Sequence, residues 1–194
     1  MSFHKYVPDK SIKLLQCWVE ELDAKIVISN PRKTKLGDFK LRNNCFIISV
    51  NNDLNPYSFL ITLTHELAHA FVYRKHGNTI KPHGVSWQLT FKHMMLNFLS
   101  PDFFPQDVLK VLSLHIIKPK ASTFSDVALV NVLRKYNSIS SFTILDVKEG
   151  NSFLLLNGRE FTKGKRLKKR FVCTEKKTQK IYLFHPLVEV IEVH

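Results

Sequence analysis

The sequence has 194 residues, 44% of them hydrophobic and 23% charged, which is ordinary for a globular protein of one domain or of one domain with a small appendage. Its formal net charge of +13 indicates a polyanionic partner, nucleic acid before an anionic membrane, although many small proteins are simply basic. No stretch approaches the roughly 20 apolar residues of a membrane helix. The N-terminal "MSFHKYVPDKSIKLL" lacks the features of a signal peptide, so we expect a cytoplasmic protein.

The first 120 residues predict a domain of the α+β class. Apolar residues recur at helical spacing between Asp9 and Leu22, and short runs rich in β-branched residues predict strands at 25–29 and 45–50. The connection between these strands, at 30–38, is rich in turn signals. Further helices are expected from Pro56 to about Lys75, over 84–99, over 105–116 and over 125–136, the last with Ser125 as its N-cap.

The pattern changes after Asn137, where short β segments separated by turn signals predict a small antiparallel sheet or partial barrel. The segments are "FTILDV" (142–147), "SFLLL" (152–156), "KRFVCTE" (169–175), "KIYLF" (180–184) and "VEVIEV" (188–193). We therefore assign 1–120 to an α+β domain, 121–137 to a connector helix and 138–194 to a β module.

Three cysteines, Cys17, Cys45 and Cys173, lie far apart in the sequence without CxxC spacing. An odd number of isolated cysteines indicates reduced thiols in a reducing compartment. This pattern predicts neither a disulfide framework nor a zinc site made of cysteines.

The stretch "THELAHAF" (64–71) contains the pattern HExxH. Because positions i and i+4 share one face of a helix, His65 and His69 point the same way, as two imidazoles must to hold one zinc ion at about 2.0–2.1 Å. Glu66 lies about 100° around the helix, where its carboxylate can take a proton from metal-bound water. An ordinary amphipathic helix is the competing interpretation, but HExxH arises by chance in such a chain with a probability of only roughly two per cent.

A catalytic zinc site needs a third protein ligand and an open position for water. His83, in "KPHGVSWQ", follows a short loop at the start of the next helix and can return to the first two histidines. His76 is a weaker candidate, because it follows His69 by about two helical turns, some 10 Å along the axis, and His93 ranks third. We therefore predict one zinc ion per chain, held by His65, His69 and His83.

The segment "LITLTHELAHAFVYRKHG", followed by "PHGVSWQLTFKHMM", resembles the SprT-like metalloprotease family, which includes the Spartan-type proteases that act on proteins crosslinked to DNA. The family pattern is HExxH and then an HGxxW segment that brings the third ligand. The matching positions are His65, Glu66, His69, His83, Gly84 and Trp87. The resemblance covers roughly residues 5 to 100.

This resemblance implies a zinc-dependent endopeptidase with a zincin-like core, in which helices and a short β-sheet flank a cleft. The three histidines would hold zinc, and Glu66 would act as the general base and later as the proton donor. An edge strand can hold a substrate peptide by β-augmentation, and "LGDFKLR" (36–42) is the candidate. We expect Trp87 to be a packing anchor and not a substrate contact.

The C-terminus departs from the family pattern. Many bacterial SprT-like proteins end in a four-cysteine zinc ribbon, whereas this chain has only Cys173 in that region. The sequence therefore predicts a variant without a second, structural zinc, in which metal-free β segments take the place of the ribbon.

Residues 159–180 hold ten lysines and arginines against two glutamates, with the aromatic residues Phe161, Phe171 and Tyr182 among or close to them. Cations beside aromatic rings suit nucleic acid, because cations track phosphates and rings stack on bases. The alternative is a solvated hairpin whose aromatics face its own core, and it is the favoured interpretation for each aromatic taken singly. The candidate nucleic-acid contacts are Lys165, Arg166, Lys168, Lys169 and Arg170.

Taken together, the sequence predicts a SprT-like zinc endopeptidase whose basic β module, binding DNA or RNA, directs it to nucleic-acid-associated proteins such as DNA–protein crosslinks. The alternative is a zinc-containing, nucleic-acid-associated binding factor with little or no proteolysis. Glu66 favours the enzyme, because holding a metal does not require it. A membrane partner is not expected, since no amphipathic basic helix with an aromatic face is evident.

Overall fold

The structure is a computed structural model that describes residues 2–32, 34–120, 126–139 and 141–193. It is a mixed α+β chain that forms two compact units, Met1–Ser138 and Ile139–His194. Each unit has a hydrophobic core of its own. The expected α+β class is therefore confirmed.

The first unit combines helices with a three-stranded sheet. The strands are β1 (Ala24–Ser29), β2 (Gly37–Arg42) and β3 (Cys45–Asn51). Their order is β1-β3-β2, with β1 parallel and β2 antiparallel to β3, so β2 lies at an edge. The helices are η1 (His4–Tyr6), η2 (Asp9–Ser11), α1 (Ile12–Leu22), α2 (Pro56–His76), α3 (Val85–Leu96), α4 (Gln106–His115), α5 (Val127–Leu133) and η4 (Arg134–Tyr136).

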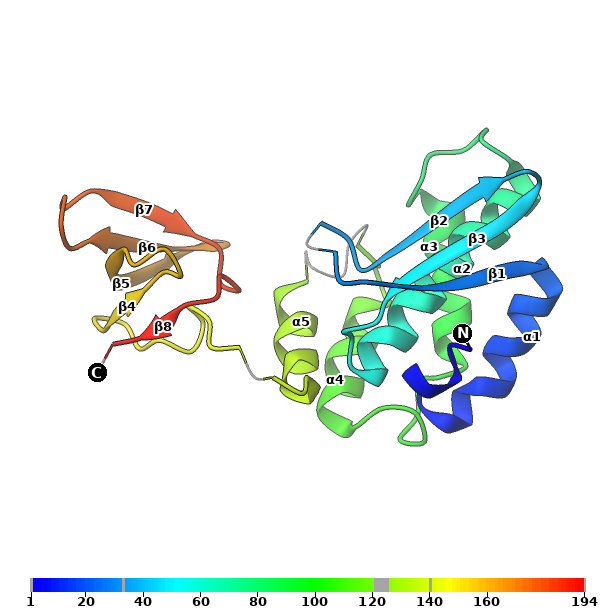
Figure 1. The fold of residues 1–194 in the computed structure, drawn as a ribbon, viewed down its shortest axis with the longest axis horizontal. Coiled ribbons are helices and arrows are strands. Elements are labelled where there is room, and N and C mark those ends of the chain that lie inside the picture. Colours follow the sequence, from blue (N-terminus) through cyan, green and yellow to red (C-terminus); the bar gives the residue numbers. More distant parts are fainter. Residues whose placement is uncertain (1, 33, 121–125, 140, 194) are drawn as a thin grey trace. The chain divides into compact units, whose positions relative to one another are not determined.

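Helix α2 is the central element of this unit. Its start is fixed locally, because the Asn55 side chain accepts a hydrogen bond of 2.9 Å from the Ser58 backbone N–H and Pro56 occupies the first turn. Strands β2 and β3 pack on α2, which also contacts α1 and α3 (Figure 1). Its fully buried apolar residues are Phe59, Leu60, Ile61, Leu63, Leu67, Ala68 and Ala70.

The segment assigned to a connector helix packs inside the first unit. Helix α5 contributes Leu129, Val132 and Leu133 to the core of that unit. The Asn55 amide also donates a hydrogen bond of 2.9 Å to the Leu133 carbonyl, which ties the end of α5 to the start of α2. The proposed cap, Ser125, lies outside the described residues, and the Asp126 side chain caps α5 instead.

The second unit is an antiparallel sheet with the strand order β7-β6-β5-β4-β8. The strands are β4 (Ser152–Leu154), β5 (Glu160–Leu167), β6 (Arg170–Glu175), β7 (Ile181–Phe184) and β8 (Ile191–Glu192). One face of the sheet is covered by its own core, in which Phe153, Phe161 and Cys173 are fully buried.

Two expectations for this unit were wrong. The segment 142–147, "FTILDV", forms a turn, because the Asp146 carboxylate accepts hydrogen bonds of 2.9 Å from both the backbone N–H and the hydroxyl of Thr143. The longest strand of the unit, β5, was missed. It contains a β-bulge between Lys163 and Arg166, and its Gly164 and charged residues hide the alternation that marks a strand.

Candidate metal centre

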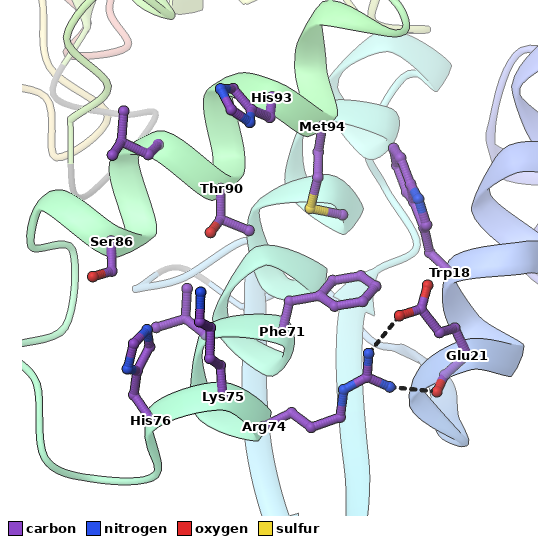
Figure 2. A pocket seen from close by; sticks show the side chains of 12 residues that line it. Trp18, Glu21, Phe71, Arg74, Lys75, His76, Ser86, Thr90, His93 and Met94 are labelled. Atoms are coloured by element: carbon purple, nitrogen blue, oxygen red, sulfur yellow. Dashed lines mark hydrogen bonds and ion pairs between the residues drawn. The ribbon is translucent and has the colours of Figure 1, made fainter.

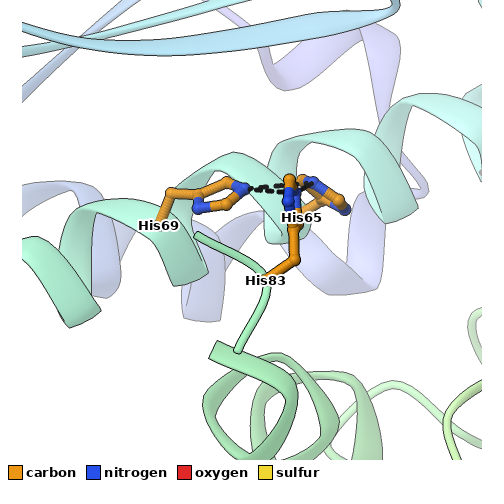
Figure 3. A group of neighbouring side chains, drawn as sticks. All are labelled: His65, His69 and His83. Carbon is orange, nitrogen blue, oxygen red and sulfur yellow. Dashed lines mark hydrogen bonds between the residues drawn. The ribbon is translucent and has the colours of Figure 1, made fainter. Parts of the chain in front are cut away.

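Three histidine side chains of the first unit converge (Figure 3). His65 and His69 come from α2, and His83 comes from the loop that leads into α3. The Nε2 atom of His65 lies 3.2 Å from those of His69 and His83, and the latter two lie 2.9 Å apart. Within the described residues they are the one group of three or more His, Cys, Asp or Glu side chains able to share a metal ion.

The spacing of these nitrogens fits a metal ion. Nitrogens that bind one zinc ion tetrahedrally at about 2.0–2.1 Å lie roughly 3.3 Å from each other. The observed triangle is close to this size, and all three corners are the same kind of atom. The residues present can therefore hold a metal ion through three imidazoles.

The local sequence "PHG" shapes the backbone that delivers the third imidazole. His83 has a left-handed conformation, with φ of 58°, which is uncommon for a residue with a side chain. A Cβ atom on Gly84 would lie 2.9 Å from the Lys81 carbonyl oxygen, so this position requires glycine. Such a conformation costs about 1–3 kcal/mol and persists where the surroundings enforce it, often at functional sites.

Trp87 supports all three imidazoles. Its side chain is only 1% exposed, and its ring centroid lies 4.5 to 5.2 Å from those of the three histidines. It stacks on Phe91 with an interplanar angle of 6°. The indole N–H also donates a hydrogen bond of 3.4 Å to the His65 carbonyl oxygen. Trp87 is therefore a packing anchor, as expected.

The imidazoles are held neutral. Burial, and then the neighbouring histidines, lower the pKa of His65 to about 2. Burial and His83 lower the pKa of His69 to about 4, and burial also lowers the pKa of His83. Since a histidine binds a metal only as the neutral imidazole, this environment favours coordination over protonation near neutral pH.

Glu66 is buried between α2 and the start of β2. Glu66 is only 8% exposed. A Cβ atom placed on Gly37 would lie 2.8 Å from both the Cγ and the Oε1 atom of Glu66. The same atom would lie 2.8 Å from the Thr62 Cγ2 atom. Only glycine therefore lets β2 begin this close to the carboxylate.

The surroundings of Glu66 are strongly desolvating. Burial, and secondly the charge of Asp38, raise the pKa of Glu66 to about 8, against the opposing effects of Arg32, Lys35 and a hydrogen bond from the Phe39 backbone N–H. A metal cation bound nearby favours the ionised form of a carboxylate. The Glu66 carboxylate is therefore protonated more readily in the metal-free protein than in the metal-bound protein.

Asn51, which is 1% exposed, fixes the connection that leads to Gly37. Its amide donates hydrogen bonds of 3.3 Å to the Arg32 carbonyl and of 3.0 Å to the Lys35 carbonyl. Its oxygen accepts one of 2.8 Å from Arg32 Nε. The sequence does not reveal this role, because nothing in "SVNNDLN" distinguishes the first asparagine from an ordinary turn residue.

The competing histidines lie elsewhere. His76 and His93 are not part of the histidine cluster, and both line a separate groove between α2 and α3 (Figure 2). This location agrees with the expectation that His83 is the better third ligand.

The candidate nucleic-acid contacts gather at the tip of the β5–β6 hairpin. Leu167 pairs with Arg170 across a two-residue turn, in which Lys168 has a left-handed φ of 43°. The exposed cations of this tip are Lys165, Arg166, Lys168, Lys169 and Arg170. We call these five residues the basic tip.

Other cations of the 159–180 segment are used by the fold. Lys163 is 6% exposed, and its ammonium donates a hydrogen bond of 2.7 Å to the Ile144 carbonyl. Arg159 pairs with Glu175 at 2.8 Å, and Lys176 pairs with Glu160 at 2.5 Å. These three residues therefore do not add to the charge available to a phosphate backbone.

The aromatic residues of this segment face their own core. Phe161 is fully buried, Phe171 is 9% exposed, and Tyr182 packs against the same core. The interpretation in which each ring belongs to the core of the hairpin is thus confirmed for all three.

Comparisons with known proteins add no relative of this chain. No family model matches it, and no curated protein or solved structure matches it either. None of the described helices combines the length and the apolar character that crossing a membrane requires.

Proposed function

We propose that this protein is a zinc-dependent endopeptidase of the SprT-like type, with His65, His69 and His83 as the zinc ligands. The observation that carries the proposal is the convergence of three Nε2 atoms within 3.2 Å of each other, with the buried Glu66 next to His65 in the sequence. The short sheet beside α2 supports a zincin-like core. Because three ligands leave a fourth position free, the donor set suits a catalytic ion better than a structural one.

A zinc ion held there would supply Lewis acidity, which activates water and polarises a peptide carbonyl. Glu66 takes the proton of the attacking water on its carboxylate and later gives it to the leaving amine. Gly37 and the backbone N–H of Phe39 hold the carboxylate in place. Trp87 keeps the imidazoles oriented by packing, because its ring contacts all three of them.

Strand β2 supplies a surface for an extended substrate. It lies at the edge of the three-stranded order, and its first residue, Gly37, touches Glu66. A substrate backbone paired with this strand therefore passes close to the general base. This arrangement supports the proposal that 36–42 holds the peptide to be cleaved.

The basic tip supports a nucleic-acid partner, DNA or RNA, and so a substrate protein bound to nucleic acid, such as a DNA–protein crosslink. Five cations within six residues at an exposed hairpin tip can contact successive phosphates. Because the aromatic rings of the unit are in its core, we propose backbone contacts and not base stacking as the source of affinity.

The test is a protease assay of the purified, zinc-loaded protein with an unfolded protein as the substrate, in the presence and absence of DNA. Metal analysis should give one zinc per chain, and Glu66→Gln should keep the metal and lose the cleavage. If the zinc-loaded wild type cleaves no substrate with or without DNA, the peptidase is excluded and the zinc-containing binding factor remains.

A further inference from the structure

A groove of about 690 Å³ opens on α2 and α3, apart from the three histidines (Figure 2). It lies between the C-terminal half of α2, one side of α3 and the end of α1. Val72, which lines it, follows His69 by three residues on the same face of α2. Ser86, in the first turn of α3, also lines the groove. The groove is therefore built on the same two helices, α2 and α3, that flank the histidine cluster.

The floor of the groove is apolar and partly open to solvent. Phe71, Met94 and Trp18 line it from α2, α3 and α1. Leu89 lines it from α3 and is 52% exposed. Val85, one turn before Leu89 on α3, is 72% exposed and extends the apolar surface beyond the groove. Covering such side chains is favourable by about 25 cal/mol for each Å² removed from water.

The rim of the groove carries one positive charge, that of Lys75, which no acidic residue of the lining balances. Lys75, His76 and His93 line it, and the one acidic residue in its lining, Glu21, is already paired with Arg74. The Arg74 guanidinium also donates a hydrogen bond of 2.6 Å to the Glu21 carbonyl. In the described part of the chain Lys75 forms no ion pair. The groove therefore complements a ligand that is apolar in the middle and acidic at its edge.

We propose that this groove binds a peptide segment in which bulky apolar side chains stand next to carboxylates, and that the segment belongs to the protein being cleaved. The second half of this statement rests on the proposed peptidase function. The apolar side chains cover Phe71 and Leu89, and the carboxylates pair with Lys75 and accept hydrogen bonds from the His93 ring. The hydroxyls of Ser86 and Thr90, which also line the groove, provide hydrogen-bonding partners for the peptide backbone.

Binding is measured separately from cleavage. The probe is a short, dye-labelled synthetic peptide of leucine, phenylalanine and glutamate, and the protein is the zinc-loaded Glu66→Gln variant, which leaves the probe intact. Fluorescence anisotropy gives the dissociation constant. Matched peptides replace either the glutamates with lysine or the apolar residues with serine, and we expect both to bind at least about tenfold more weakly.

The groove is tested from the protein side with Lys75→Glu combined with Leu89→Glu. Because both side chains are exposed, the zinc content should stay unchanged. An unchanged zinc content shows that the variant folds. We expect about a tenfold or greater loss of affinity for the acidic probe. Lys110→Glu combined with Leu114→Glu makes the same change of charge at two exposed positions of α4 outside the groove; it is the matched control and should leave binding as in the parent protein.

Several outcomes overturn the proposal. These are equal binding of the lysine probe, displacement of the peptide by oleate at lower concentration than by unlabelled peptide, or self-association of the protein that Leu89→Glu abolishes. Equal binding of the lysine probe would show that the groove does not select acidic peptides. Displacement by oleate would assign the groove to a lipid, and self-association would assign it to a second copy of the chain.

Cleavage is then mapped with the active protein on a mixture of unfolded proteins. Acidic and bulky apolar residues should be enriched on one side of the cleaved bonds, and Lys75→Glu with Leu89→Glu should remove this enrichment. Cleavage without enrichment overturns the groove while the peptidase stands. Binding of the probe without any cleavage by wild type overturns the peptidase and the assignment of the segment to its substrate.

Discussion

The three histidines of the first unit and the five cations of the basic tip differ in how firmly each side chain is held. The imidazoles are packed against Trp87 and Phe91, and backbone conformation fixes the third of them. The cations of the tip are exposed on a hairpin, and the contacts of their side chains are peripheral: Arg166 lies 5.7 Å from the Phe171 ring centroid, and Arg170 donates a hydrogen bond of 3.4 Å to the Leu183 carbonyl. A metal centre demands positions within fractions of an ångström, whereas a phosphate chain tolerates mobile charges. The two regions should therefore respond differently to substitution.

The largest expected effect is the loss of metal. His65→Ala, His69→Ala and His83→Ala should each lose most of the zinc, because two imidazoles hold the ion far less tightly than three. Mass spectrometry of the metal content of purified protein checks this, with His76→Ala and His93→Ala as matched controls that keep it. Full zinc in His83→Ala together with loss in either control would show that the ligand assignment is wrong.

Next in size is the loss of catalysis in Glu66→Gln. General-base removal typically costs about 10²–10⁴-fold in rate, and here the amide keeps the size of the carboxylate. Initial rates on an unfolded protein substrate measure the effect, and the zinc content should equal that of wild type. An unchanged rate would remove Glu66 from the mechanism.

Gly37→Ala tests the close approach of β2 to α2. The added Cβ atom meets Glu66 and Thr62 at 2.8 Å, so we expect a loss of about 1–3 kcal/mol in the free energy of unfolding. Urea denaturation of the single variants and of the double variant with Glu66→Ala forms a thermodynamic cycle. The cost of Gly37→Ala should fall in the Glu66→Ala background. The same cost in both backgrounds would mean that the strain lies elsewhere.

Replacing Arg166, Lys168, Lys169 and Arg170 with glutamine tests the basic tip. If each contacts one phosphate, the slope of log affinity against log salt should become shallower by about 3 in total, with weaker binding to all sequences alike. Salt titration against a short oligonucleotide measures this, and zinc content should stay unchanged. Lys176→Gln is the control, because this lysine is paired with Glu160. An unaltered slope in the fourfold variant would leave the tip as a solvated surface.

The smallest effect is a pH dependence within the second unit. The hydrogen bond from Arg159, and then that from Thr178, lower the pKa of Glu175 below its usual 4.5. A lowered pKa in the folded state stabilises the unit above pH 4.5, and this stabilisation is lost as the pH falls through the lowered value. In Arg159→Gln, the stability of the second unit should therefore fall less steeply as the pH is lowered. The fluorescence of a label on the second unit, recorded during acid unfolding, measures this. If wild type and Arg159→Gln lose stability equally as the pH falls, the Arg159–Glu175 pair is not the cause of the pH dependence.

The sequence by itself determined the elements whose signals are local. The start of α2 follows from Asn55 and Pro56, and the common face of His65 and His69 follows from helical spacing alone. His83 could be ranked above His76 and His93 for the same reason, since helix geometry limits the reach of each side chain. The charge of the basic tip is also a local property, because the five cations occupy six consecutive residues.

The tertiary structure alone decided which residues meet across the chain. Glu66 touches Gly37, and Asn51 holds the loop before it, because β2 and β3 fold back on α2 from distant positions. Lys163 looks like one more surface cation in the sequence, yet the bulged strand turns it toward the carbonyl of Ile144. Burial and long-range packing set these contacts, and neither depends on the neighbours in sequence that periodicity and spacing describe.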